Sequence, residues 1–240
     1  MHDRAEADAL RVGGLTPLTT IDYPGELAAV IYCQGCPWRC RYCHNGHLLE
    51  QDTSDGERIA WDQVMGFLED RRGLLDAVVF SGGEPTVQGA LSAAMRAARA
   101  LGFKVGLHTG GAYPQRLRRI LPLVDWVALD IKALADDYPA LTGVTGSGEP
   151  AWESLALLLA SEVALEVRTT VPPGWGLEQL APLVTALAEA GVRDYCLQRC
   201  DATLSLDPGL RELPATALRQ LVTELPTERF ERFELRGAGY

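Results

Sequence analysis

Short apolar runs alternate with segments of helical periodicity along most of this 240-residue chain. The runs are apolar throughout, which is typical of parallel strands that are buried on both faces. The expected strands are residues 27–32, 76–80, 103–107, 126–131, 163–171, 194–198 and 232–236. The expected helices are residues 60–71, 88–101, 114–121, 151–161, 177–190 and 214–225. This alternation predicts an α/β fold in which crossover helices join parallel strands.

The number of strand–helix units limits the architecture. About six units are too few for a closed eight-fold barrel, so a partial (β/α)6 barrel or an open doubly wound sheet is expected. The length favours a single domain over 1–240, with an N-terminal extension over 1–26 and a core over 27–236. In either architecture, ligands bind at the carboxyl ends of the strands.

The charge balance argues against one broad class of partner. The formal net charge is −10 and the basic residues form no cluster, so no nucleic-acid partner is expected. The chain has no run of about eighteen apolar residues, and its first residues lack the apolar core of a secretory signal. We therefore expect a cytoplasmic protein without a membrane partner, whose cysteines are reduced and available for metal binding or catalysis.

Four of the six cysteines lie within eleven residues, directly after the first expected strand. They are Cys33, Cys36, Cys40 and Cys43. Two C-x2-C pairs with His44 and His47 nearby leave a zinc site open. However, only three residues separate the pairs, whereas structural zinc sites usually place them a dozen or more apart. Incidental packing of buried cysteines is a second alternative.

An iron–sulfur cluster is the third alternative, and the spacing favours it. Cys36, Cys40 and Cys43 form a C-x3-C-x2-C pattern, and closely spaced thiolates on one loop can wrap a cubane cluster. Three thiolate ligands leave one iron open to a small molecule. The remaining cysteines, Cys33, Cys196 and Cys200, are expected to be packing residues.

A glycine-rich segment follows the second expected strand, with Gly82, Gly83, Glu84 and Pro85 in succession. Two glycines let the backbone approach a ligand closely, the glutamate supplies an acceptor, and the proline stiffens the turn. An ordinary strand-to-helix turn is the alternative for such a segment taken alone. Its position at a strand's carboxyl end, next to the cysteine segment, favours a ligand site.

Charged side chains accompany two further expected strands. Asp130 and Lys132 stand at the end of 126–131, where an unpaired carboxylate or ammonium is costly. Arg168 lies in the middle of the apolar run 163–171, where arginine is rarely buried without a partner. For these residues, contact with a bound ligand and an internal ion pair both remain open.

Taken together, the motifs resemble the radical S-adenosylmethionine (SAM) superfamily. The resemblance rests on the C-x3-C-x2-C segment after a first strand, on the aromatic Tyr42 before its last cysteine, and on the Gly-Gly-Glu segment. It implies a partial barrel of the radical SAM type with two cofactors. These are a [4Fe–4S] cluster on Cys36, Cys40 and Cys43, and SAM on the open iron.

The resemblance also implies cofactor-binding residues. Gly82, Gly83 and Glu84 would bind the methionine ammonium, and the backbone around Tyr42 would contact the adenine. Related activating enzymes of this superfamily often carry Thr-Asn-Gly where this chain has Thr109, Gly110 and Gly111. Position 110 therefore lacks the asparagine side chain of those enzymes. The further residues expected at the cofactor are Thr109, Asp130, Lys132 and Arg168.

Within the superfamily, the chain resembles the activating enzymes of anaerobic (class III) ribonucleoside-triphosphate reductases. This finer resemblance rests on residues 14–25, Gly-Leu-Thr-Pro-Leu-Thr-Thr-Ile-Asp-Tyr-Pro-Gly, together with Gln34-Gly35-Cys36, Cys43-His44-Asn45-Gly46 and Ser81-Gly82-Gly83-Glu84-Pro85-Thr86. It implies that SAM is cleaved reductively to a 5′-deoxyadenosyl radical, which abstracts hydrogen from a glycine of the reductase. The partners would then be this glycyl radical enzyme and a reductant such as flavodoxin or ferredoxin.

Three other functions remain open at this point. The protein substrate could be another glycyl radical enzyme, of the formate-lyase type. A small-molecule enzyme, such as a synthase of 7-deazapurine precursors, would keep the cofactors and change the substrate. A non-catalytic metal-binding scaffold would bind metal without cleaving SAM, although the intact cysteine and Gly-Gly-Glu motifs argue against it.

Overall fold

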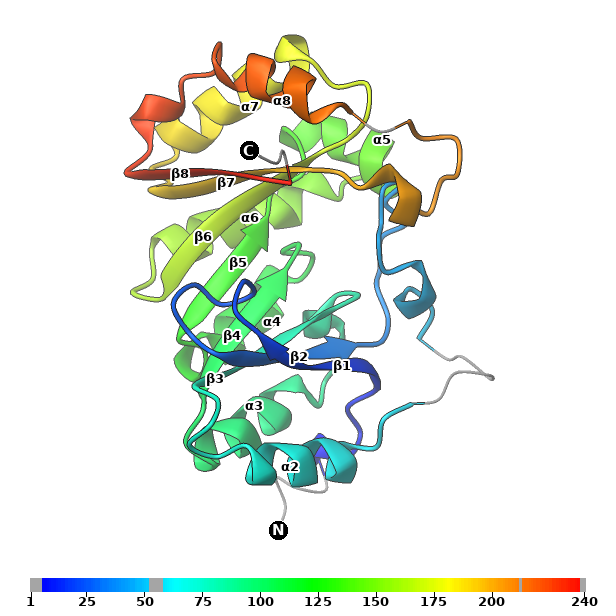
Figure 1. Ribbon diagram of the computed structural model, residues 1–240, viewed down its shortest axis with the longest axis vertical. Coiled ribbons are helices and arrows are strands. Elements are labelled where there is room, and N and C mark those ends of the chain that lie inside the picture. Colours follow the sequence, from blue (N-terminus) through cyan, green and yellow to red (C-terminus); the bar gives the residue numbers. More distant parts are fainter. Residues whose placement is uncertain (1–5, 52–57, 212, 238–240) are drawn as a thin grey trace. The chain divides into compact units, whose positions relative to one another are not determined.

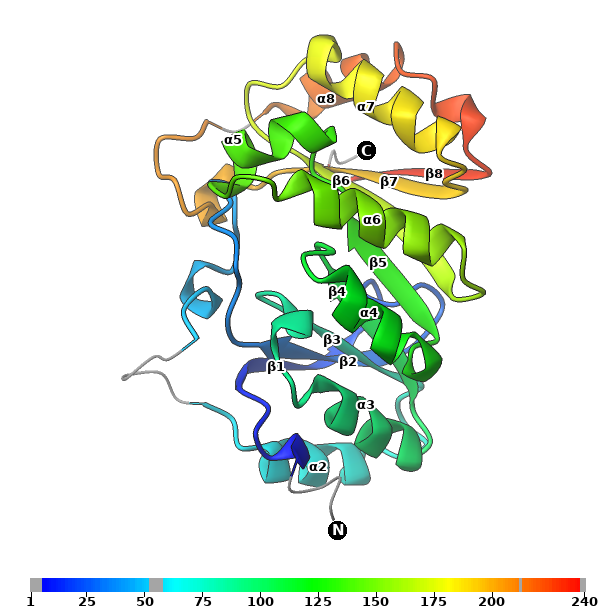
Figure 2. The same cartoon turned by 180° about the vertical axis from the view of Figure 1, so that it is seen from behind.

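The computed structural model describes residues 6–51, 58–211 and 213–237 (Figures 1 and 2). The chain divides into two units. Unit 1 comprises Met1–Pro37 and His47–Ala128, and unit 2 comprises Trp38–Gly46 and Leu129–Tyr240. The segment that carries the clustered cysteines passes from unit 1 into unit 2 after Pro37 and returns at His47.

Unit 1 is built on a mostly parallel sheet. Its strands are β1 (Val12–Thr19), β2 (Ala28–Cys33), β3 (Ala77–Gly82) and β4 (Lys104–Thr109), and its helices are α2 (Trp61–Asp70), α3 (Leu91–Ala100) and α4 (Pro114–Ile120). Strand β1 is antiparallel to β2, whereas β2, β3 and β4 are parallel, with Ala77 paired to both Ala28 and Lys104. In both views α2 and α3 lie on the same side of β1, β2 and β3.

The two faces of β2 and β3 are both apolar because both are covered. Side chains alternate between faces along a strand, so Val30 and Val79 share one face and Ile31 and Phe80 the other. On the first face they pack with Tyr23, whose ring stacks on Trp126 at 5.0 Å between ring centroids. Ile31 and Phe80 are completely buried as well. This double burial explains why the strands read as continuous apolar runs.

Unit 2 repeats the strand–helix pattern. Its strands are β6 (Ala164–Val171), β7 (Asp194–Arg199) and β8 (Arg232–Arg236), which are parallel, and its helices are α5 (Tyr138–Thr142), α6 (Gly148–Leu159), α7 (Leu177–Glu189) and α8 (Ala215–Val222). Helix α7 buries Leu180, Leu183, Val184 and Leu187, the spacing of one helical face. In both views α7 and α8 lie on one side of β7 and β8.

Strand β5 (Trp126–Asp130) contributes residues to both units. Hydrogen-bonded neighbours follow chain order from β1 to β8, so β1 and β8 are the two edges and the sheet is not closed. The prediction of an α/β fold with parallel strands and crossover helices is therefore confirmed. Every expected strand and helix is present, with ends shifted by at most three residues.

Strand β1 was not among the expected strands. Residues 12–19 contain two glycines, two threonines and Pro17, so they form no apolar run. The pairing with β2 shifts register between Thr16 and Thr19, around this proline. Proline donates no backbone hydrogen bond, and an edge strand with an irregular register tolerates it. No helix among residues 6–51, 58–211 and 213–237 is long and apolar enough to cross a membrane.

Candidate radical SAM site

In unit 1, the loop after β3 hydrogen-bonds to the loop after β2. The Gly83 N–H donates to the Cys33 carbonyl at 2.9 Å, and the Glu84 N–H donates to the Gly35 carbonyl at 2.8 Å. Cys36, the first cysteine of the motif, follows in the same loop and donates its N–H to the Leu49 carbonyl at 3.0 Å. The structure therefore brings the Gly-Gly-Glu segment next to the start of the cysteine segment.

Close backbone approach explains both glycines. A Cβ on Gly83 would lie 2.3 Å from the Gly35 carbonyl oxygen. Gly82 has φ of +114°, in the region that favours glycine, and a Cβ there would lie 2.4 Å from the Cys33 nitrogen. The glycines were expected to admit a ligand, and the structure gives them a second role in joining two loops.

We expect Gly83→Ala to destabilise the protein by about 1–3 kcal/mol, the usual cost of overpacking against a structure that cannot move freely. The matched control is Gly89→Ala, because a Cβ at Gly89 meets nothing within 4 Å. Thermal unfolding followed by circular dichroism measures the difference. Equal midpoints for the two variants would contradict the close-approach explanation.

Glu84 is only 2% exposed, and its carboxylate accepts hydrogen bonds from two loops. The donors are the Thr86 N–H at 3.1 Å, the Thr86 hydroxyl at 2.5 Å, the Thr109 hydroxyl at 2.8 and 2.9 Å, and the Gly110 N–H at 2.9 Å. Burial raises the pKa of Glu84, while these donors act to lower it. Glu84 therefore ties the carboxyl end of β3 to the carboxyl end of β4, where Thr109 lies.

Two glutamine side chains also hold the cysteine segment, and neither was among the predicted site residues. The Gln34 amide donates to the carbonyls of His47 and Glu50, at 3.1 and 2.8 Å. The Gln88 amide donates to the Gln34 carbonyl at 3.1 Å. Both side chains are buried, and a buried amide requires partners. Their hydrogen bonds can be seen only in the folded chain, where loops that are distant in the sequence meet.

In unit 2, Cys40 and Cys43 lie one turn apart, and the Cys43 N–H donates to the Cys40 carbonyl at 3.0 Å. Cys40 is buried and Cys43 is half-buried. Burial raises the pKa of the Cys40 thiol, and the ammonium of Lys132 acts to lower it. A cation near this thiol favours the thiolate, which is the form that binds metal.

Lys132 lies beside the cysteine segment, together with Asp130. Its Nζ is 5.8 Å from the centroid of the Tyr42 ring and 6.0 Å from that of Trp38. The same Nζ is 3.6 Å from the Asp130 carboxylate. The internal ion pair, one of the two alternatives for these residues, is therefore present. Lys132 is also within reach of two aromatic rings, an arrangement that stabilises a buried cation.

Arg168 lies on β6 and pairs with Glu166 on the same strand. Glu166 also accepts two hydrogen bonds from Arg236 on β8, both at 2.9 Å. The internal ion pair is thus present for Arg168 too. Arg168 is 8% exposed, so the carboxylate supplies the partner that its burial requires.

The donor set of the cysteine segment fits an iron–sulfur cluster. None of the six cysteines forms a disulfide, so Cys36, Cys40 and Cys43 offer three reduced thiols on one continuous segment. Thiolates are the ligands that hold such clusters. Cys33 and Cys196 are buried and belong to strands, as expected of packing residues.

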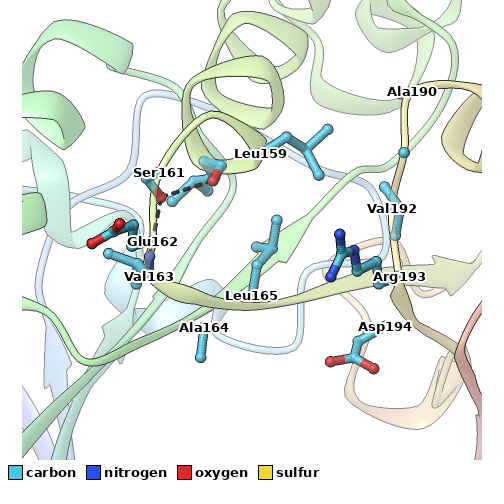
Figure 3. Close-up of a pocket in the computed structure, with 12 residues that line it drawn as sticks. Leu159, Ser161, Glu162, Val163, Ala164, Leu165, Ala190, Val192, Arg193 and Asp194 are labelled. Carbon is cyan, nitrogen blue, oxygen red and sulfur yellow. Dashed lines mark hydrogen bonds between the residues drawn. The ribbon is translucent and has the colours of Figure 1, made fainter.

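A separate cavity of about 530 Å³ in unit 2 lies at the other end of the strands (Figure 3). It is lined by residues before and at the start of β6 and β7, including Ser161, Leu165 and Arg193. Ser161 caps the turn, donating to the Leu158 carbonyl at 2.7 Å. The nearby Asp194 carboxylate is held by Arg232 at 2.6 Å. This cavity is therefore distinct from the carboxyl ends where the expected cofactor residues lie.

Comparison with known proteins defines the class. The chain belongs to the radical SAM superfamily, because the family model described as Radical SAM superfamily matches residues 30–187. Proteins of this superfamily use a [4Fe–4S] cluster and SAM, and these are the cofactors of this enzyme.

Within the superfamily, the relatives are glycyl-radical enzyme activating enzymes. The chain is 30% identical over 212 residues to a Methanocaldococcus jannaschii protein named for that group, with 85% of each chain covered. It is also 30% identical over 174 residues to the pyruvate formate-lyase 1-activating enzyme of Escherichia coli, with 69% of each covered.

Solved structures support the fold alone, because their sequences are too distant to say more. QueE from Escherichia coli matches with a TM-score of 0.63 and 17% identity, covering 98% of each chain. Streptococcus suis SuiB, in complex with its precursor peptide SuiA, matches with a TM-score of 0.69 and 18% identity. That match covers 87% of this chain and 48% of SuiB, so the chain spans about half of that protein.

Proposed function

We propose that this enzyme generates a glycyl radical on a protein substrate, and that the substrate is an anaerobic ribonucleoside-triphosphate reductase. The observation that carries the radical activity is the similarity to activating enzymes along 85% of the chain. The reductase is favoured by the segment Thr-Ile-Asp-Tyr-Pro-Gly over 20–25 and by Cys43-His44-Asn45-Gly46. A flavodoxin or ferredoxin would serve as the reductant.

In this proposal the cofactors are held at the carboxyl ends of the strands. Cys36, Cys40 and Cys43 hold the cluster. The loop of Gly82, Gly83 and Glu84 binds the methionine ammonium, with Glu84 and Thr109 keeping that loop in place. The backbone around Tyr42 contacts the adenine. Asp130, Lys132 and Arg168 are proposed to complete the charged surroundings of the cofactors.

When bound, the reduced cluster and SAM would supply the electron and the 5′-deoxyadenosyl radical needed to remove a hydrogen atom from the α-carbon of the substrate glycine, with methionine and 5′-deoxyadenosine as the other products. The protein's own residues orient the reacting groups and exclude water from them. Glu84 in unit 1, and Cys40 and Tyr42 in unit 2, are each buried, which supports exclusion of water at these residues.

An activating enzyme of the formate-lyase type is the second candidate. It is favoured by the similarity to the Escherichia coli pyruvate formate-lyase 1-activating enzyme over 69% of both chains. The small-molecule alternative rests on no more than the shared cysteine and Gly-Gly-Glu motifs.

The test is to load the protein with iron and sulfide without oxygen, reduce it, and add SAM with each of two purified partners. The partners are an anaerobic ribonucleoside-triphosphate reductase and a pyruvate formate-lyase. Electron paramagnetic resonance should show a glycyl radical on the reductase, with 5′-deoxyadenosine formed in proportion. A radical on the lyase alone would select the second candidate. Deoxyadenosine without a radical on either protein would refute both.

A further inference from the structure

A segment after β7 hydrogen-bonds to the backbone that carries two of the cluster cysteines. The Leu206 N–H donates to the Cys43 carbonyl at 3.1 Å, and the Asp207 N–H donates to the Arg41 carbonyl at 2.9 Å. Both bonds lie within unit 2. Cys43 is thereby tied to a part of the chain more than a hundred and fifty residues away in sequence.

The opposite edge of the same backbone is bonded to α5. The Arg39 N–H donates to the Thr142 carbonyl at 2.8 Å, and the Arg41 N–H donates to the Leu141 carbonyl at 3.3 Å. The backbone around Cys40 is therefore held from two sides. Cys43 is held by a local bond, in which its own N–H donates to the Cys40 carbonyl. The long-range bond is the one that the Cys43 carbonyl accepts from Leu206.

Side chains join the same two segments. The Arg41 guanidinium donates to Asp207 Oδ2 from Nε at 3.0 Å and from Nη2 at 2.6 Å. The Sγ of Cys200, which is completely buried, lies 3.7 Å from Nε2 of His44. Cys200 was expected to be a packing residue. The structure places its thiol next to His44, which directly follows Cys43.

We propose that residues 200–207 form a positioning strap, which orients the thiol of Cys43 for the cluster. The inference rests on the proposed role of Cys43 as a cluster ligand. A ligand must be held near its productive geometry by supporting residues, and a half-buried loop residue has conformational freedom that opposes this. The bond from Leu206 restricts the peptide of Cys43 directly. The strap acts on Cys43 through its peptide, so the role proposed for the strap is to position this residue.

Leu206→Pro tests the strap, because it removes the N–H that donates to Cys43. Ser205 has φ of −72° and ψ of 146°, a conformation that suits a residue before proline. The matched control is Leu206→Ala, which keeps the N–H and removes a side chain that is 45% exposed. Asp207→Asn is a second comparison, which weakens the ion pair between Oδ2 and the exposed Arg41 and keeps one side-chain oxygen to accept from the Gly209 N–H, now 2.8 Å from Oδ1.

We expect Leu206→Pro to lose iron to a chelator roughly fivefold faster than Leu206→Ala, which is the effect of one lost hydrogen bond. Its reduced cluster should also show altered g-values in electron paramagnetic resonance, a change that a general loss of stability does not produce. Asp207→Asn should change the rate less than about twofold, because exposed ion pairs contribute little. Equal rates and identical spectra for Leu206→Pro and Leu206→Ala would overturn the strap.

The unaltered protein provides a second test, should Leu206→Pro fail to fold. Coupling between two sites is reciprocal, so cluster loading should slow hydrogen exchange at the amides of Leu206 and Asp207. Unchanged exchange at both amides would overturn the inference. A chain that assembles no cluster at all would refute the proposed function and the strap with it. A cluster that assembles but shows the same iron loss and the same spectrum in Leu206→Pro and Leu206→Ala would refute the strap alone.

Discussion

Replacing Cys40 by alanine is expected to lower the formation of 5′-deoxyadenosine more than about a hundredfold, since even the outer partners of metal ligands typically contribute ten- to a hundredfold. Cys40 is the buried member of the C-x3-C-x2-C segment, and Lys132 lies near it. Loss of its thiol leaves an iron without a protein ligand. The measurements are iron content per chain and 5′-deoxyadenosine after anaerobic reduction with SAM.

Cys196→Ala is the matched control for this experiment. Cys196 is buried, like Cys40, but lies on β7, outside the cysteine segment. It should keep the iron content and the SAM cleavage of the unaltered protein. If the Cys40 variant kept both, or if the Cys196 variant lost both, the assignment of the cluster to the C-x3-C-x2-C segment would be wrong.

Replacing Glu84 by glutamine is expected to have the second largest effect. The Glu84 carboxylate accepts from the Thr86 and Gly110 N–H groups as well as from two hydroxyls, so a glutamine must point its NH2 group at a donor. The loss of a buried, charge-assisted bond costs about 2–3 kcal/mol. For a chain of this size, that cost corresponds to a fall of roughly 5–10 °C in the unfolding midpoint.

The same substitution should weaken SAM binding, because Glu84 ties together the two loops proposed to meet the cofactor. Equilibrium binding of SAM to the cluster-loaded protein measures this effect alongside the unfolding midpoint. Glu178→Gln is the control, because Glu178 is exposed in the first turn of α7. A Glu84→Gln protein with an unchanged unfolding midpoint and an unchanged affinity for SAM would show that these hydrogen bonds stabilise neither the fold nor the proposed SAM site.

The secondary structure could be predicted almost completely, because burial determines which residue types occur along each strand and helix. Strands covered on both faces are apolar throughout, as β2 and β3 show, and their ends differ from the expected ones by a residue or two. Strand β1 could not be predicted in this way. It lies at an edge of the sheet and contains Pro17, so its place depends on pairing with β2 rather than on its own composition.

The candidate site was predictable to the extent that its chemistry depends on residue types at short spacing. Three cysteines within eight residues, and two glycines before a glutamate, can be recognised without a fold. Their partners could not be recognised. Thr109 is twenty-five residues from Glu84, and Arg236 is seventy residues from Glu166, so no local pattern joins them.

The sequence by itself determined the α/β class, the strand and helix positions, the motif cysteines and the membership of the radical SAM superfamily. These properties follow from periodicity and from short-range spacing, which are local features of the sequence. Only the tertiary structure decided that Gly83 serves close backbone approach, that Glu84 joins two loops, and that residues 200–207 hold the backbone of Cys43. Such contacts arise when parallel strands bring their carboxyl-end loops together, and residue spacing alone does not specify which loops then meet.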